Sequence, residues 1–176
     1  MNVIEIFNSI EGEGTRQGHL CTFVRLYDCN IRCSYCDTLY SYDTNDYKTM
    51  SVEDVADEIK RIGNKCVTIT GGEPLLQAEE VAKLIQLLPE FKFNIETNGT
   101  ILPPFYFDNL FYTYDYKCPT SCAEEHMNVG FFEKLKSTDV VKFVVGSYVD
   151  LNRMKEIIEL YPTAAQVFVS PVFGEI

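Results

Sequence analysis

Short apolar runs alternate with amphipathic helical segments along most of this chain, and this alternation limits the folds that the chain can adopt. The runs are rich in β-branched and aromatic residues and read as strands, at residues 22–27, 67–70, 93–96, 110–114, 140–145 and 167–169. Repeated strand and helix units are typical of a parallel sheet. The pattern therefore predicts an α/β fold, a partial (β/α) barrel of about six parallel strands, with ligand-binding loops at the C-terminal strand ends.

Three segments between these runs have the spacing of amphipathic helices. Ser51 opens the first with a start like a capping box, and the second begins at Asp150. The third, residues 75–88, ends before a proline. The residues expected on the buried faces of the first two helices are Val52, Val55, Ala56, Ile59 and Ile62, then Leu151, Met154, Ile157, Ile158 and Tyr161.

Composition limits both the size of the fold and the kind of partner. With 176 residues and 46% hydrophobic content the chain can build one core, so we expect a single domain spanning 1–176. A formal net charge of −11 argues against nucleic acid as a partner, since phosphate binding needs a basic patch. The N-terminus has no basic lead, and no run of about 18 apolar residues occurs, so we expect a cytoplasmic protein without a membrane span.

Cys29, Cys33 and Cys36, spaced C-x3-C-x2-C, offer one ligand fewer than a closed metal site requires. A cubane iron–sulfur cluster is normally held by four thiolates, so three would leave one iron open to an exchangeable ligand. Structural zinc also binds cysteines, and Cys118 with Cys122 could complete a zinc site. A disulfide framework is disfavoured by the odd total of seven cysteines and by the large apolar fraction. The motif therefore indicates a 4Fe-4S cluster, with zinc as the alternative.

Two other loops that follow predicted strands carry distinctive residues. Residues 70–74 read Thr-Gly-Gly-Glu-Pro, and residues 96–99 read Glu-Thr-Asn-Gly. The C-terminal ends of parallel strands meet at one edge of the sheet, which places both loops beside the cysteines. Gly71 and Gly72 would let the backbone approach a ligand closely, although a plain turn between strand and helix would read the same way.

The cysteine motif together with residues 70–74 resembles the radical S-adenosylmethionine superfamily. Within it, the chain resembles the 7-carboxy-7-deazaguanine synthase family in segments that span nearly the whole sequence, at residues 7–14, 23–25, 36–38, 115–117, 142–145 and 170–174. The resemblance implies a 4Fe-4S cluster on Cys29, Cys33 and Cys36, with S-adenosyl-L-methionine bound at the open iron. It further implies that Thr38 ligates Mg²⁺.

The same resemblance implies a division of the site between substrate and cofactor. Substrate contacts are implied for Ile10, Glu11, Gly12, Glu13, Arg25 and Thr70. Contacts to S-adenosylmethionine are implied for Gly72, Glu73, Asn98, Asp115, Tyr116 and Lys117. The planar guanidinium of Arg25 would pair with the substrate carboxylate. Position 11 departs from the family pattern, in which Gln is the commonest residue.

The activity that the resemblance implies is the ring contraction of 6-carboxy-5,6,7,8-tetrahydropterin to 7-carboxy-7-deazaguanine, with loss of ammonia, in queuosine and deazapurine biosynthesis. The cluster and the cofactor would carry the chemistry, with electrons from a flavodoxin-like or other reductant. Family members are often homodimers, and they usually continue past residues 170–174, so the chain is expected to lack their C-terminal tail. Two alternatives stay open: a glycyl-radical enzyme activating protein, and a passive iron–sulfur or zinc-binding electron-transfer module.

Overall fold

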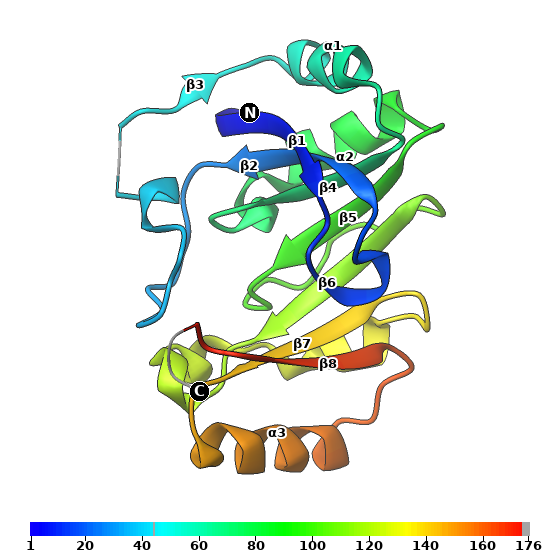
Figure 1. The fold of residues 1–176 in the computed structure, drawn as a ribbon. Helices are drawn as coiled ribbons and strands as arrows, with labels where there is room; N and C mark the ends of the chain where they lie inside the picture. Colours follow the sequence, from blue (N-terminus) through cyan, green and yellow to red (C-terminus); the bar gives the residue numbers. More distant parts are fainter. Residues whose placement is uncertain (44, 174–176) are drawn as a thin grey trace.

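The computed structural model describes residues 1–43 and 45–173, which build one sheet with helices on its outside (Figure 1). The strands are β1 (Asn2–Ile10), β2 (Leu20–Leu26), β3 (Lys48–Thr49), β4 (Cys66–Gly71), β5 (Lys92–Thr97), β6 (Leu110–Tyr116), β7 (Val140–Val145) and β8 (Gln166–Pro171). The α-helices are α1 (Val52–Ile62), α2 (Ala78–Leu87) and α3 (Tyr148–Leu160). Short 3-10 helices lie in the connections: η1 (Gly14–Arg16), η2 (Leu39–Ser41), η3 (Pro74–Gln77), η4 (Pro119–Ser121), η5 (Glu124–His126) and η6 (Val129–Lys134).

The strand order in the sheet is β3-β1-β2-β4-β5-β6-β7-β8. All pairs from β2 through β4 to β8 are parallel, whereas β1 pairs antiparallel with β2 and β3 pairs antiparallel with β1. The predicted α/β class with a mostly parallel sheet is therefore confirmed. The sheet is not closed into a barrel, because β3 and β8 lie at the two ends of the strand order.

The N-terminal strand β1 is the main element that the sequence pattern missed. Its alternate residues Glu5, Phe7 and Ser9 lie opposite Arg25, Phe23 and Cys21 of β2. Polar residues at positions 5, 8 and 9 interrupt the apolar pattern by which the other strands were predicted. Pairing with β2, which is a tertiary contact in the sheet, makes this segment a strand.

The helix starts agree only in part with the sequence pattern. Ser51 caps α1 through its side chain, as predicted. Helix α3 begins at Tyr148 rather than at Asp150, because Ser147 is its N-cap and accepts a hydrogen bond from the Asp150 backbone N–H at 3.3 Å. The predicted helix 75–88 is divided into η3 and α2. Within the described part of the chain, none of the helices has both the length and the apolar character needed to cross a bilayer.

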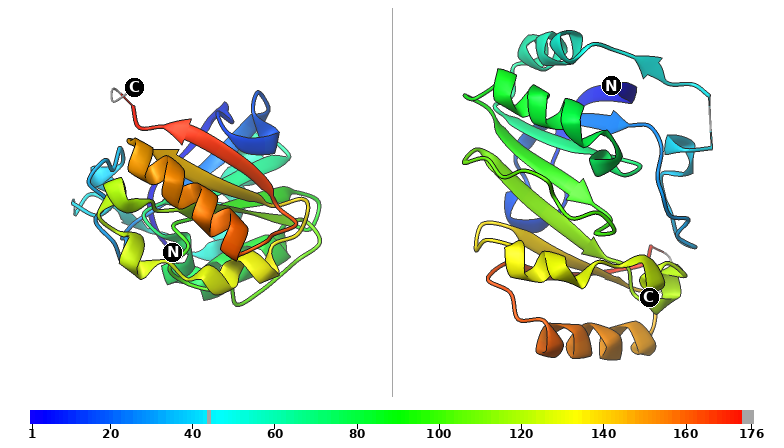
Figure 2. Two further views of the ribbon diagram at one scale, coloured as in Figure 1. Left: turned by 90° about the horizontal axis from the view of Figure 1, so that it is seen from below. Right: turned by 180° about the vertical axis from the view of Figure 1, so that it is seen from behind.

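Side chains alternate between the two faces of the sheet, and the faces have opposite character. The outer face is apolar and shares one core with buried residues of the three α-helices, which Figure 2 shows along the outside of the sheet. Its buried residues include Val67, Ile69, Phe93, Ile95, Tyr112, Tyr114, Val141 and Phe143. The inner face carries Thr68, Thr70, Asn94, Glu96, Thr113, Asp115 and Lys142. Parallel sheets usually bury apolar side chains on both faces, so the polar inner face indicates a ligand site.

Candidate functional site

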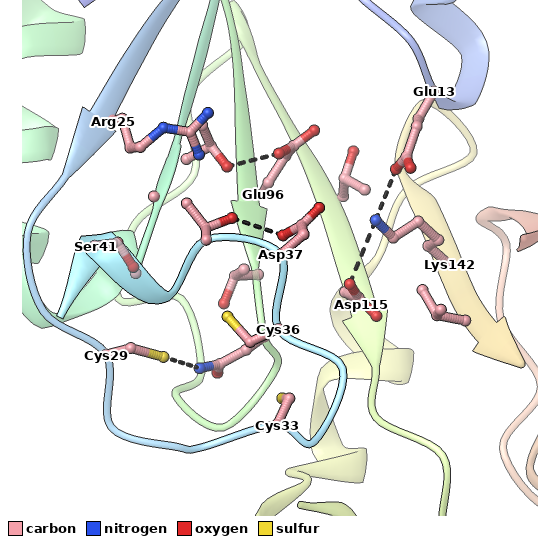
Figure 3. Close-up of a pocket in the computed structure, with 18 of the residues that line it drawn as sticks. Glu13, Arg25, Cys29, Cys33, Cys36, Asp37, Ser41, Glu96, Asp115 and Lys142 are labelled. Carbon is pink, nitrogen blue, oxygen red and sulfur yellow. Dashed lines mark hydrogen bonds and ion pairs between the residues drawn. The ribbon is translucent and has the colours of Figure 1, made fainter. Parts of the chain in front are cut away.

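A cavity of about 550 Å³ opens on the inner face at the C-terminal ends of the parallel strands (Figure 3). Its lining includes most of the residues predicted for the site: Glu11, Gly12, Glu13, Arg25, Cys29, Cys33, Cys36, Thr38, Thr70, Gly72, Asn98, Asp115 and Lys117. Of the matching segment 170–174, residues 170–173 line the cavity and Gly174 lies outside the described residues. The fold therefore gathers side chains from distant parts of the sequence in one pocket.

The three cysteines lie in the loop after β2, and their half-buried side chains line the same end of the pocket (Figure 3). All three are free thiols. Burial raises the pKa of Cys33 to about 11, and the nearby Lys117 ammonium opposes that rise. Asn98 Nδ2 donates to Cys29 Sγ at 3.6 Å, so the loop after β5 contacts the cysteine loop directly.

The metal alternatives can be compared with this geometry. Cys118 is fully buried, and its Sγ lies 4.0 Å from the Asp150 carbonyl oxygen, whereas Cys122 is exposed. Neither lines the pocket, so the described residues do not build the four-ligand zinc site. Across residues 1–43 and 45–173, no three His, Cys, Asp or Glu side chains converge on a single-ion site. A cubane has its irons at separate corners, so three thiols around one pocket suit it without converging on one point.

Gly71, the last residue of β4, and Gly72 after it allow two turns of the backbone to pack directly together. Gly71 has φ of +120°, in the left-handed region, and pairs with Leu26 in the parallel ladder. A Cβ at Gly72 would lie 1.7 Å from the carbonyl oxygen of Asp28, the residue before Cys29. The Glu73 N–H donates to that same oxygen at 2.8 Å. The Gly-Gly pair therefore supports the start of the cysteine loop.

Glu73 was predicted as a cofactor contact, but the structure buries its side chain beneath the pocket. Its Oε1 accepts hydrogen bonds from the Leu75 N–H and the Thr97 hydroxyl, both at 2.9 Å. Its Oε2 accepts from the Asn98 N–H at 2.7 Å. Burial raises the pKa of Glu73 to about 7 even though three hydrogen bonds favour the carboxylate. This carboxyl group thus ties the loop after β4 to the loop after β5, which positions Asn98.

Arg25 projects from β2 into the pocket beside a carboxylate that the sequence pattern missed. Its Nε pairs with Glu5 Oε1 at 2.8 Å, and its guanidinium carbon lies 5.8 Å from the ring centre of Phe7 and 5.5 Å from that of Tyr40. Aromatic faces attract a guanidinium and restrict its orientation. Glu5 was not predicted as a pocket-side residue because its strand, β1, was not predicted.

Two lysines and two carboxylates form a charged group on the other side of the pocket. Lys142 Nζ lies 2.6 Å from Glu13 Oε2 and 3.4 Å from Asp115 Oδ2. Lys117 Nζ lies 2.8 Å from the same Asp115 oxygen. Burial alone would raise the pKa of Asp115, but the two ammonium groups outweigh it and hold the pKa below its usual value. The group joins the loop after β1 to β6 and β7.

Two further carboxylates line the pocket between these charged groups. Thr70 Oγ1 donates to Glu96 Oε2 at 2.7 Å, and burial raises the pKa of Glu96. Thr68 Oγ1 donates to Glu11 Oε2 at 2.6 Å, and the Gly12 N–H donates to Glu11 Oε1 at 3.2 Å. The inner-face threonines therefore orient both carboxylates.

Two predicted contacts lie away from the pocket. The side chain of Tyr116 is on the outer face, 1% exposed, and its hydroxyl donates to Glu124 Oε1 at 2.9 Å. Neighbouring residues of a strand point to opposite faces, so Tyr116 cannot share the pocket with the Asp115 side chain. Ile10 is 61% exposed at the end of β1 and is absent from the lining. Any ligand contact of these two residues would have to come from their backbone.

Two pocket residues, Glu96 and Lys142, were not assigned a role from the sequence. Each is a charged residue inside a run that otherwise reads as a buried strand, Phe-Asn-Ile-Glu in one case and Val-Val-Lys-Phe in the other. A lone charged residue in a buried strand is rare unless it is paired, and this unusual placement could have marked both residues as candidates for the site.

Thr38, the predicted Mg²⁺ ligand, lines the pocket with its Oγ1 2.6 Å from Asp37 Oδ1.

Comparison with known proteins shows the family to which this chain is similar. The family model described as Radical SAM superfamily matches residues 24–112. A protein of Methanospirillum hungatei named 7-carboxy-7-deazaguanine synthase is 43% identical over 180 residues, covering 99% of this chain and 74% of that protein. The protein of the same name from Clostridium acetobutylicum is 41% identical over 182 residues, covering 99% of this chain and 82% of that protein.

The fold is similar to the crystal structure of QueE from Escherichia coli, with a TM-score of 0.83, 23% sequence identity, and coverage of 98% of this chain and 84% of that one. That likeness supports the fold, while the sequence relatives carry the family assignment. Because the family model covers half of the chain and the two relatives match 99% of it, the chain belongs to the radical SAM superfamily and to its 7-carboxy-7-deazaguanine synthase family.

Proposed function

We propose that this chain catalyses the radical, S-adenosylmethionine-dependent ring contraction of 6-carboxy-5,6,7,8-tetrahydropterin to 7-carboxy-7-deazaguanine, with loss of ammonia. The names of the relatives from Methanospirillum hungatei and Clostridium acetobutylicum support this activity. The observation that carries the proposal is the pocket itself, in which three free thiols and the Arg25 guanidinium line one cavity. The chain is accordingly an enzyme, a radical S-adenosylmethionine lyase.

The pocket has two chemically different ends, and we infer that they bind different molecules. Figure 3 shows Cys29, Cys33 and Cys36 grouped at one end, with Arg25 and Glu96 toward the other. The cysteines would hold a 4Fe-4S cluster with one iron open for S-adenosylmethionine. When bound, the cluster and this cofactor would supply the 5′-deoxyadenosyl radical that removes a hydrogen atom from C6 of the substrate.

Residues between the two ends are suited to hold the cofactor. The Gly72 backbone, the Asn98 side chain and the Asp115–Lys117 ion pair all line the pocket next to the cysteine loop. Paired charges of opposite sign suit the amino and carboxylate groups of an amino acid. We infer that Thr38, beside Asp37, provides the protein ligand for Mg²⁺, which prefers oxygen ligands and keeps several positions for water or substrate.

The substrate end offers complementary partners for a carboxylated pterin. Among the described residues, the hydrogen bond of the Arg25 guanidinium comes from Nε, so its terminal nitrogens can form a bidentate pair with the substrate carboxylate. The carboxylates of Glu11, Glu13 and Glu96 can accept hydrogen bonds from the N–H groups of an amino-pyrimidinone. Because burial raises the pKa of Glu96, this group is also suited to hold a proton beside the substrate.

Arg25→Ala should lower kcat/KM for the pterin about tenfold to a hundredfold while leaving reductive cleavage of S-adenosylmethionine intact. The reason is that Arg25 faces the substrate carboxylate, whereas the thiols lie at the other end of the pocket. Arg61→Ala on the exposed side of α1 is the matched control, since within the described part of the chain this arginine pairs with Glu58 on its own helix. Normal kcat and KM in Arg25→Ala would refute the carboxylate assignment.

The proposed function is tested by an anaerobic assay of the reconstituted protein with S-adenosylmethionine, dithionite, Mg²⁺ and 6-carboxytetrahydropterin. Mass spectrometry would follow 5′-deoxyadenosine and 7-carboxy-7-deazaguanine. Formation of both products supports the proposal. Deoxyadenosine alone would point to another substrate, such as the protein partner of a glycyl-radical activating enzyme. Neither product from a protein with an intact cluster would favour the passive electron-transfer module.

The proposal also covers the domain organisation, the electron donor, the cellular compartment and the oligomeric state. We infer that residues 1–176 form one radical SAM domain, that the substrate is a small molecule, and that a flavodoxin-like or other reductant supplies the electron. All seven cysteines are free, which suits work in the reducing cytoplasm. Family resemblance is the basis for expecting a homodimer.

A further inference from the structure

Asp150 lies outside the pocket, yet its carboxylate joins three elements that meet behind the cysteine loop. It is fully buried in the first turn of α3. Its Oδ1 accepts a hydrogen bond from the Thr120 N–H at 2.9 Å, and its Oδ2 accepts one from the Gly146 N–H at 2.8 Å. Thr120 belongs to η4 after β6, and Gly146 directly follows β7. One carboxylate therefore fixes η4, the end of β7 and the start of α3 relative to one another.

The short helix η4 in turn contacts the cysteine loop. Ser34, the residue after Cys33, donates from Oγ to the Thr120 carbonyl oxygen at 2.6 Å and from its N–H to the Ser121 carbonyl oxygen at 2.9 Å. Thr120 is thus bound on both sides of its backbone, through its N–H to Asp150 and through its carbonyl to Ser34. A continuous chain of hydrogen bonds connects the buried carboxylate with the segment between two cysteines.

The chemistry of Asp150 suits a rigid support. Burial alone would raise the pKa of Asp150, but its hydrogen bonds with Thr120, Gly146 and Ser147 hold the pKa below its usual value. Hydrogen bonds to an ionised acceptor are stronger than neutral ones. The carboxylate also lies at the N-terminal end of α3, where the helix dipole favours negative charge.

We propose that Asp150 is a positioning residue for the cysteine loop, holding η4 and, through it, the Ser34 segment where Cys33 faces the pocket. The inference deepens the proposed function and rests on it, since it assumes that the loop binds a cluster. Asp150 is not in the pocket lining, so its effect is transmitted through η4.

Asp139 provides a matched control at the other end of β7. It is also buried, and its carboxylate also accepts two backbone N–H groups, from Tyr112 at 2.9 Å and from Lys136 at 2.7 Å. It directly precedes β7 and is absent from the pocket lining. Asp139→Ala and Asp150→Ala therefore remove the same chemistry from the two ends of one strand, and only the second removes contact with η4.

Hydrogen exchange of the metal-free protein, read by mass spectrometry on residues 29–38, tests the proposal without requiring a cluster. Asp150→Ala should speed exchange of this loop about tenfold or more, because two partly buried backbone N–H groups lose their acceptor and local opening becomes easier. Asp139→Ala should change exchange of the loop less than about twofold. Equal acceleration in both variants, or none in Asp150→Ala, would overturn the proposal. If the alanine variants do not fold, Asp150→Asn and Asp139→Asn should show the same ranking.

Ser34→Ala tests the last link at an exposed position. It should also speed exchange of residues 29–38, and combining it with Asp150→Ala should add little, because both changes break one chain of contacts. Fully additive effects would overturn the proposal.

In reconstituted protein, Asp150→Ala should release iron to a chelator several-fold faster than Asp139→Ala. A wild-type protein that takes up no iron–sulfur cluster would contradict the proposed function instead, with the exchange result unaffected.

Discussion

Cys33→Ala should give a folded protein that neither retains a 4Fe-4S cluster nor cleaves S-adenosylmethionine. Cys33 is one of only three thiols in the pocket lining, so its loss leaves two ligands where a cluster normally has at least three from the protein. Anaerobic reconstitution, with iron and sulfide analysis and the visible absorption of the cluster, measures retention. Mass spectrometry of 5′-deoxyadenosine measures cofactor cleavage, which we expect to fall to background.

Cys122→Ala is the matched control for this change. Cys122 is an exposed thiol outside the pocket, so its replacement should leave both iron content and deoxyadenosine formation at the level of the unmodified protein. The pair of variants also tests the zinc alternative, which assigned a ligand role to Cys122. Metal loss in Cys122→Ala, or full iron content in Cys33→Ala, would contradict the assignment of the cluster to the three-cysteine loop.

Gly72→Ala should lower the free energy of unfolding by about 3 kcal/mol and prevent stable cluster incorporation. The new Cβ would lie 1.7 Å from the Asp28 carbonyl oxygen and 3.0 Å from the Cys29 backbone nitrogen. Both neighbours are backbone atoms, so a rotamer change cannot relieve the clash and the start of the cysteine loop must move. Denaturant unfolding of the metal-free protein measures the stability, and iron content after reconstitution measures the effect on the loop.

Gly12→Ala is the control for the glycine effect. Among the residues that the structure describes, no heavy atom would lie within 4 Å of a Cβ at Gly12, and Gly12 does not have a positive φ. Unfolding free energy and iron content should therefore stay close to those of the unmodified protein. If Gly72→Ala behaved like Gly12→Ala in both measurements, the close packing of the two turns would not be what holds the cysteine loop.

The strands of the parallel sheet could be predicted because their signal is local. Val140–Val145, for example, is apolar and β-branched or aromatic except for Lys142, which faces the pocket, and such a short run is typical of a strand in a parallel sheet. The N-terminal strand could not be predicted in the same way. Polar residues at positions 5, 8 and 9 interrupt the apolar pattern of residues 2–10, and it is the pairing with β2 that makes this segment a strand.

In the candidate site, too, the features that depend on a short segment could be predicted from the sequence, and the others could not. The cysteine spacing is informative by itself, because three thiolates in eight residues belong to one loop whatever the fold. The roles of single residues near strand ends are not local. Tyr116 and Asp115 are neighbours in the sequence, but one joins the aromatic core and the other lines the pocket. Resemblance alone could not separate them, since both belong to one matching segment.

The sequence by itself determined the cluster motif, the α/β class and the family, because each depends on residue identity and spacing within short segments. The tertiary structure decided which groups meet: the pairing of Arg25 with Glu5, the burial of Glu73 beneath the pocket, and the support of the cysteine loop by Asp150. These contacts join residues that are 20, 24 and 30 positions apart in the chain. Their energies depend on distance and burial in space, which spacing along the chain does not specify.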